Sequence, residues 1–204
     1  MYNLILKDFR LQKWLFLIYL AIVVLYIGVG SNLPVITAVV GGSYAINTHW
    51  YDSKKNGNIF LISLPYSRGK IILSKFIGTF IVSVIYAFIT LGLQAAITGG
   101  KETGSIGDIL FGLMSVMIFT ALYFPLLYKF SNRYLVTILS FLFILFIFFG
   151  MKVMDLAGEM VMSFFETVVS LSPADLLAWT GAVTVVLCVM SYFLTLKIYK
   201  AREF

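Results

Sequence analysis

Charge is scarce in this sequence. Only 12% of the 204 residues are charged and 61% are hydrophobic, whereas an ordinary globular domain has about 25% charged residues. One small water-soluble core cannot hide so much apolar surface, and the mean hydropathy of +0.99 agrees. The composition therefore excludes an ordinary soluble domain and indicates a polytopic membrane protein.

Residues that bind metals or react are also few. Cys188 is the single cysteine, which excludes an intramolecular disulfide and a thiolate metal cluster. The single histidine, His49, lies beside Trp50 and Tyr51. This neighbourhood favours a place in the aromatic belt at the membrane interface over metal or proton chemistry. We therefore expect no catalytic residue, bound metal or cofactor in this chain.

The sequence lacks the residues that nucleotide binding and nucleic-acid binding require. The phosphate loop requires the pattern G-x-x-x-x-G-K-[ST], and Gly69-Lys70 departs from it because Leu64 and Ile71 stand at the required glycine and hydroxyl positions. The net charge is +6, but the cations do not form a basic domain with interspersed aromatic residues that could bind nucleic acid. The sequence thus predicts a chain that binds neither ATP with Mg²⁺ nor nucleic acid.

Long uncharged apolar segments are what the sequence has instead. A helix needs about 20 mostly apolar residues to cross the hydrocarbon core, and a charged residue at its centre costs about 2.5 to 3.5 kcal/mol. We predict an all-α integral membrane fold, with a single transmembrane permease domain over residues 1–204. Its six predicted spans are residues 14–31, 33–51, 76–98, 109–128, 134–151 and 176–196.

The distribution of cations predicts the orientation. With six spans, both termini and the second and fourth connections lie on one side, and these segments hold 13 of the 15 cations. By the positive-inside rule that side is cytoplasmic, which predicts a multi-pass plasma-membrane protein with both termini in the cytoplasm. The same cations would contact anionic lipid of the inner leaflet.

The N-terminal segment has the pattern of an interfacial elbow helix. Apolar residues recur there at helical spacing, and charged residues lie on another face, as in helices that lie along a membrane surface. The alternative is a simple extension of the first span. The apolar residues are Tyr2, Ile5, Leu6 and Phe9, and the charged ones are Lys7, Asp8 and Arg10.

The segment between the fifth and sixth predicted spans is also amphipathic. Polar residues including Asp155, Glu159 and Glu166 recur every three or four positions, as on one face of a helix. We expect an amphipathic helix at the outer surface, either as an outer gate formed by these three acids or as a helix that only caps the bundle.

The second cytoplasmic connection is the most informative part of the chain. Residues 59–64 are too apolar for a free loop and need a partner surface, and Pro65 ends any helix that precedes it. Arg68, Lys70 and Lys75 follow. At the headgroup level these cations would anchor the third span, a role we assign above all to Lys70 and Lys75.

At these residues the sequence resembles the permease subunits of type-2 ABC exporters, in particular small six-span bacterial permeases. The matching pattern is an acid at the end of span two, an apolar run, a Leu-Pro pair, an arginine, and a lysine as span three starts. Here these are Asp52, residues 59–64, Leu64-Pro65, Arg68 and Lys75. Exporters of amphipathic cytolytic peptides and bacitracin-type resistance permeases are the most similar in general character.

The resemblance implies a transport subunit rather than an enzyme. It would export an amphipathic peptide, antibiotic or lipid-like substrate, powered by two copies of a separate ATP-binding subunit that hold ATP and Mg²⁺. A second permease chain, identical or different, would complete a dimer. A coupling helix between spans two and three would dock on the ATP-binding subunit. The interface residues implied are Asp52, Ile59, Phe60, Leu61, Leu64, Pro65 and Arg68.

Two other functions stay open at this point. An ATP-independent transporter or channel would usually carry an inverted repeat, and no convincing repeat is present. A membrane-embedded enzyme acting on lipid needs clustered His, Asp, Glu or Ser residues near one interface, and His49 is the only histidine.

Overall fold

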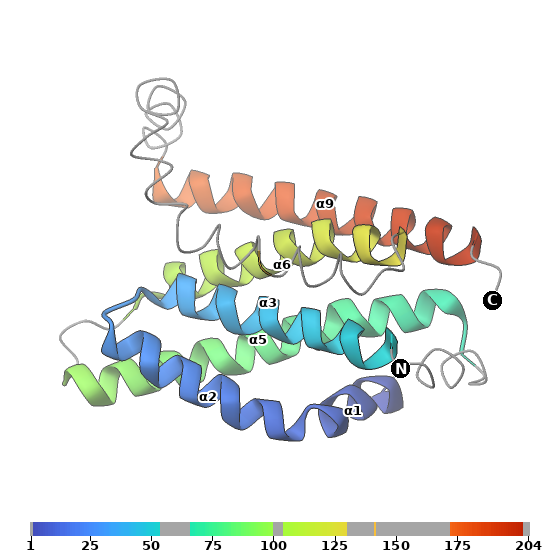
Figure 1. Ribbon diagram of the computed structural model, residues 1–204. Helices are drawn as coiled ribbons and strands as arrows, with labels where there is room; N and C mark the ends of the chain where they lie inside the picture. Colours follow the sequence, from blue (N-terminus) through green and yellow to red (C-terminus); the bar gives the residue numbers. More distant parts are fainter. Residues whose placement is uncertain (1, 54–65, 100–103, 130–140, 142–171, 202–204) are drawn as a thin grey trace.

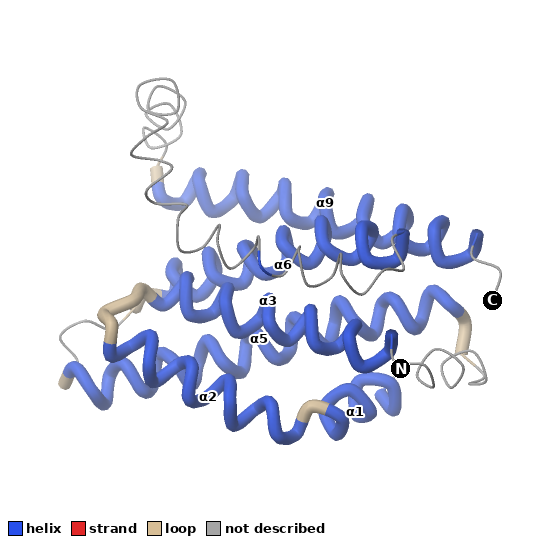
Figure 2. Tube along the Cα trace, in the orientation of Figure 1, coloured by secondary structure: helices blue, strands red, loops and turns tan. Residues whose placement is uncertain are grey.

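The computed structural model describes residues 2–53, 66–99, 104–129, 141 and 172–201, and every element in these ranges is an α-helix (Figure 1; Figure 2). The amino terminus and the end of the last helix lie at the same end of the bundle (Figure 1). The helices are α1 (Tyr2–Leu11), α2 (Lys13–Gly28), α3 (Leu33–Ser53), α5 (Arg68–Thr98), α6 (Ile106–Lys129) and α9 (Pro173–Ala201).

Helix α3 occupies the centre of the bundle. It packs against α2, α5 and α6, and α6 in turn packs against α9. Helices α1 and α2 therefore lie on one side of α3, and α9 lies on the other (Figure 1). This arrangement brings the end of α3, the start of α5 and the end of α9 to the same end of the molecule as α1.

Left-handed glycines end α2 and α5, and Gly99 caps α5 with φ 62°. Gly30 follows α2 with φ 76°, a left-handed conformation that glycine adopts without a Cβ penalty. Its N–H donates to the Ile27 carbonyl, and the next N–H, of Ser31, donates to the Tyr26 carbonyl. This pairing is the Schellman motif, and it turns the chain back from α2 into α3.

Serine and aspartate three residues apart begin two others. Before α6, the Ser105 hydroxyl accepts from the Asp108 N–H at 3.2 Å, and the Asp108 carboxylate accepts from the Ser105 N–H at 2.7 Å. Before α9, the Asp175 N–H donates to the Ser172 hydroxyl at 3.2 Å. The reciprocal pair at α6 and the single bond at α9 satisfy free N–H groups of each first turn.

The described residues contain fewer candidate membrane spans than the six predicted for the whole chain. By length and apolar composition, Arg68–Ile97, Ile106–Lys129 and Ala174–Ala201 could each cross a bilayer, and the bent pair α1 and α2 could make a fourth span. The predicted span 134–151 lies outside the described residues, apart from Phe141. The described part of the chain thus supports three or four spans, and the total of six stays a prediction.

Helix α3, which covers the predicted span 33–51, is less apolar than these helices and lies at the centre of the bundle. Its 21 residues include small and polar side chains such as Gly41, Thr37 and Asn47, which neighbouring helices enclose. Thr37 is fully buried and its hydroxyl donates to the Leu33 carbonyl at 3.0 Å. A helix shielded by protein can hold such groups when each finds a partner.

Close packing around α3 depends on small residues. A methyl group added at Gly41 would contact Ser83 and would lie 2.6 Å from a Val116 methyl, so only hydrogen fits between α3, α5 and α6 there. On the other side of α3, Tyr44 stacks with Phe16, and Phe16 stacks with Tyr86. The core therefore combines a tight small-residue crossing with an aromatic layer.

Candidate functional site

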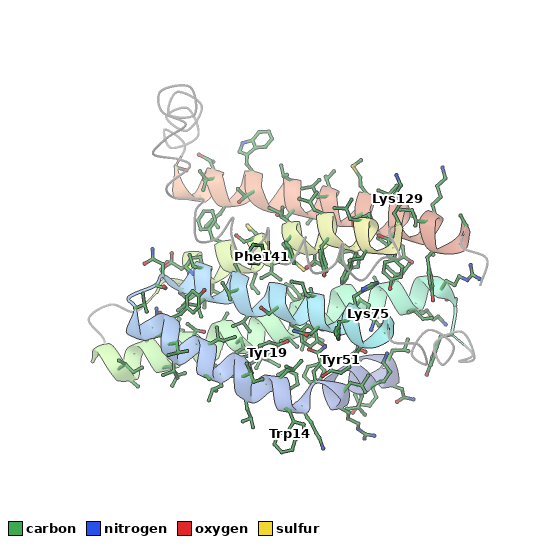
Figure 3. All side chains as sticks on the ribbon, viewed as in Figure 1. Trp14, Tyr19, Tyr51, Lys75, Lys129 and Phe141 are labelled. Carbon is green, nitrogen blue, oxygen red and sulfur yellow. The ribbon has the colours of Figure 1, made fainter. Side chains whose placement is uncertain are left out.

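Four charged side chains from three helices meet at the end of the bundle that carries α1. Lys7 Nζ lies 3.0 Å from Asp8 Oδ1 and 2.8 Å from Asp52 Oδ1. Lys75 Nζ lies 2.8 Å from Asp8 Oδ2 and also contacts Asp52 Oδ2. Each ion thus touches two ions of opposite charge, and together they form a closed charge ring that joins α1, α3 and α5. Figure 3 shows Lys75 near this end.

The charge ring is largely shielded from solvent. The side chains of Asp8 and Lys75 are each 4% exposed, that of Asp52 is 8% exposed and that of Lys7 is 19% exposed. Buried charges are costly unless they are paired, and this ring carries two charges of each sign. Its net charge of zero explains how four ions persist inside an otherwise apolar bundle.

The pKa values of two members reflect this pairing. Burial alone would raise the pKa of the Asp52 carboxyl, but the ammonium groups of Lys75 and Lys7 outweigh it and hold that pKa below its ordinary value. Burial would likewise lower the pKa of Lys7, and the carboxylates of Asp52 and Asp8 outweigh it and raise that pKa. Asp52 and Lys7 are therefore both charged across the physiological range.

A chain of polar side chains continues from the charge ring along α2 and α3. Gln12, between α1 and α2, is 1% exposed, and its amide donates to the Thr48 hydroxyl at 2.7 Å. The Tyr19 hydroxyl donates to Gln12 Oε1 at 3.2 Å and accepts from Asn47 Nδ2 at 3.1 Å. These bonds hold the junction at which α1 bends 68° away from α2.

A second contact at the same end joins the start of α5 to the end of α9. Arg68 Nη1 donates to the Tyr199 carbonyl at 2.9 Å and to the Lys200 carbonyl at 3.1 Å. The guanidinium also lies 5.5 Å from the centre of the Tyr199 ring. A cation that bonds the free carbonyls of a helix C-terminus is favourable, so Arg68 ties the two helices together.

The structure places some of the predicted site residues and leaves others undescribed. Asp52 and Arg68 both contact partners within the chain, and Lys70 is exposed. Lys75 was expected at the headgroup level, but its ammonium points into the charge ring because it pairs there with the carboxylates of Asp8 and Asp52. The remaining predicted residues lie outside the described part of the chain: Ile59, Phe60, Leu61, Leu64, Pro65, Asp155, Glu159 and Glu166.

Sequence reasoning missed two members of the charge ring. Lys7 and Asp8 were placed on the face of α1 opposite its apolar residues, whereas Asp8 is 3% exposed and faces the bundle. Leu4 is buried on the same side. A signal was present: Asp8 and Asp52 are rare acids in segments otherwise rich in cations. Such acids are good candidates for internal pairs.

Comparison with known families identifies the family of this chain. The profile of the family described as ABC-2 family transporter protein matches residues 3–200, nearly the whole chain. The chain belongs to this family. No individual curated protein and no solved structure gives a match.

Membership defines the general role of this ABC-2 permease. Members of the family are the membrane components of ABC transporters, are typically not catalytic themselves, and generally pair with ATP-binding subunits. The charge ring suits such a component: its four ions satisfy one another, so it can hold helices together and move with them. It presents no unpaired charge to a ligand.

Proposed function

We propose that this ABC-2 permease is the membrane subunit of an exporter that moves an amphipathic peptide, an antibiotic or a lipid-like substrate out of a bacterial cell. Two copies of a separate ATP-binding subunit, which hold ATP and Mg²⁺, dock on the segment 52–68. A second permease chain completes the pathway across the plasma membrane. Both termini lie in the cytoplasm in this proposal.

The observation that supports the coupling role is the anchoring of both flanks of this segment. Asp52, next to the last residue of α3, bonds to α1 and α5 through the charge ring. Arg68, the first residue of α5, bonds to the end of α9. A displacement of the segment by a docked subunit would therefore reach four helices, because Asp52 of α3 is tied to α1 and α5 and Arg68 of α5 is tied to α9.

In this proposal the roles divide along the segment. Ile59, Phe60, Leu61, Leu64 and Pro65 form the docking surface, and Asp52 and Arg68 transmit its movement into the bundle. The nature of the cargo rests on the family resemblance and on the aromatic share of 17%, which suits an amphipathic or lipid-like molecule.

The experiment starts with candidate ABC ATP-binding subunits from the same genome, taken first from the genes next to this one. The two chains are expressed together, purified in detergent and placed in proteoliposomes, where the rate of ATP hydrolysis is measured with and without the permease. We expect the ATP-binding subunit to co-purify and its hydrolysis to rise in the complex. Failure to co-purify, or a hydrolysis rate that the permease does not change, would refute the proposal.

Variants then separate transmission from docking. Arg68→Gln removes the contact with α9 and should leave the complex intact while reducing permease-stimulated hydrolysis. The matched control is Lys13→Gln, which removes an exposed cation at the start of α2 and should leave both properties unchanged. Equal effects of the two variants would argue against a role of Arg68 in coupling.

A further inference from the structure

An apolar groove runs between α5 and α9. Its volume is about 530 Å³, within the range of about 300 to 1,000 Å³ that is usual for small-molecule sites. Leu73, Ile77 and Phe80 line the α5 wall, Val189 and Phe193 line the α9 wall, and Met117 of α6 contributes to the base. The wall side chains stay exposed, with Phe193 at 63% and Phe80 at 44%.

Cations continue both walls beyond one end of the groove. On α5, Lys70 precedes Leu73 by three residues and Ile77 by seven, so it lies on the same helical face. On α9, Lys197 follows Phe193 by four residues and shares the face of that side chain. Both lysines are exposed. An apolar channel thus ends at two positive charges, one from each wall.

No carboxylate in the described part of the chain balances these two lysines. Asp8 and Asp52 are engaged in the charge ring. The acids Asp108 and Asp175 lie in the first turns of α6 and α9, at the opposite end of the bundle (Figure 1). Among the described residues the end of the groove therefore carries an uncompensated positive charge, which favours an anionic ligand.

The size of the groove fits the leaflet of a bilayer. Residues 73 to 80 cover about 10 Å along the axis of α5, at 1.5 Å per residue, and one leaflet contributes about 15 Å of hydrocarbon. Lys70 lies about one helical turn further out, where headgroups begin. A ligand with an acyl chain and a negatively charged head would match both parts.

We propose that this groove is a binding site for an anionic phospholipid, with an acyl chain between α5 and α9 and the phosphate-bearing head at Lys70 and Lys197. The leaflet is the cytoplasmic one in the orientation proposed above. The site is separate from the charge ring and from the docking segment. It needs no ATP-binding subunit, so its test does not depend on the proposed exporter function.

The test uses photocrosslinking in nanodiscs. The full chain is reconstituted in phosphatidylcholine nanodiscs that contain a trace of a lipid with a diazirine in one acyl chain, either phosphatidylglycerol or phosphatidylcholine at equal mole fraction. After illumination, mass spectrometry maps the crosslinks. We expect crosslinks at residues 73–80 and 188–193, with phosphatidylglycerol favoured at least about fivefold, the effect of one cation near an anionic surface.

Variants show whether the two lysines cause the preference. Lys70→Gln combined with Lys197→Gln should bring the ratio of the two lipids close to one, and Lys13→Gln, at an exposed cation on α2, should leave it unchanged. A ratio close to one in the unmodified chain would mean ordinary bulk lipid and would overturn the proposal. Absence of crosslinks in the groove would mean that protein covers it, such as a second copy of the chain. Loss of the crosslinks on addition of an amphipathic peptide, with no dependence on lipid charge, would assign the groove to cargo instead.

Discussion

Replacing Asp52 by asparagine should destabilise this ABC-2 permease strongly, because it removes one of two negative charges from the charge ring. Lys7 and Lys75 would then share only Asp8, and the ring would hold a net positive charge. Lys75 retains Asp8 at 2.8 Å but is itself 4% exposed, so its charge cannot reach water. Removing one partner of a buried ion pair costs about 3 to 5 kcal/mol.

The lower part of this range is the better expectation for Asp52→Asn. Lys7 is 19% exposed and can turn toward solvent, which relieves part of the excess charge. A loss of about 3 kcal/mol is still a large share of the 5 to 15 kcal/mol that stabilises a typical domain. For a chain of about 200 residues it corresponds to a fall in Tm of about 6 to 12 °C.

The assay is thermal unfolding of the purified chain in a mild detergent. Asp175→Asn is the matched control, since it makes the same chemical change at an exposed residue at the start of α9 and should cost no more than the loss of a helix cap, about 1 kcal/mol. If Asp52→Asn lowered Tm no more than this control, the charge ring would not stabilise the bundle and the reasoning would fail.

A double variant separates pairing from other effects of the substitution. Combining Asp52→Asn with Lys75→Met removes one charge of each sign and leaves Lys7 paired with Asp8. We expect the double variant to be about 0.5 to 3 kcal/mol more stable than the sum of the two single effects predicts, because contacting residues couple by this amount. Simple additivity would show that Asp52 and Lys75 do not interact in the folded protein.

Further predictions concern pH, the contact of α5 with α9, and the packing of α3. The lowered pKa of Asp52 stabilises the folded state above the unfolded pKa of about 3.9, and the raised pKa of Lys7 stabilises it below the unfolded pKa of about 10.4. Tm should therefore be level from about pH 5 to 9 and should fall at lower and at higher pH. A steady slope of Tm between about pH 5 and 9 would contradict the pairing of these two groups in the charge ring. Arg68→Gln should cost about 1 to 2 kcal/mol, as the loss of a cation at a helix C-terminus does, and urea unfolding that shows no change would argue against the contact. Gly41→Ala should cost about 1 to 3 kcal/mol by overpacking, whereas Gly28→Ala, with no atom within 4 Å of the added methyl, should not; equal thermal stability of the two would contradict the close crossing.

Apolar runs made the helices of the bundle predictable. Five predicted spans overlap described helices, because an uncharged apolar segment of this length typically forms a helix that crosses the membrane. The spans 14–31, 33–51, 76–98, 109–128 and 176–196 correspond to α2, α3, α5, α6 and α9, respectively. The start of α5 was placed too late. It begins at Arg68 and its 31 residues extend about 46 Å, longer than the hydrocarbon core of about 30 Å, so a helix need not end where its apolar run does.

The charge ring was not predictable, because its contacts join residues far apart in the chain. Lys7 and Asp52 are 45 positions apart, Asp8 and Lys75 are 67 apart, and Arg68 contacts a carbonyl 131 positions away. Helical periodicity only separates one face of α1 from the other. It placed Lys7 and Asp8 on a charged face, but it could not show that Asp52 of α3 and Lys75 of α5 lie opposite them.

The two contacts that flank the docking segment differ in how they would respond to movement. The charge ring is buried and closed, so pulling Asp52 away from it would leave three ions unbalanced in a medium of low polarity, at a cost of several kcal/mol. The bond of Arg68 to α9 lies partly in solvent, where water can replace the lost carbonyls, so breaking it costs less than opening the charge ring. In the proposed transport cycle, α1, α3 and α5 should therefore move as one unit with the docked segment. The contact between α5 and α9 is the weaker tie: it carries small displacements to α9 and should be the first to open in a large one, next to the groove assigned to lipid.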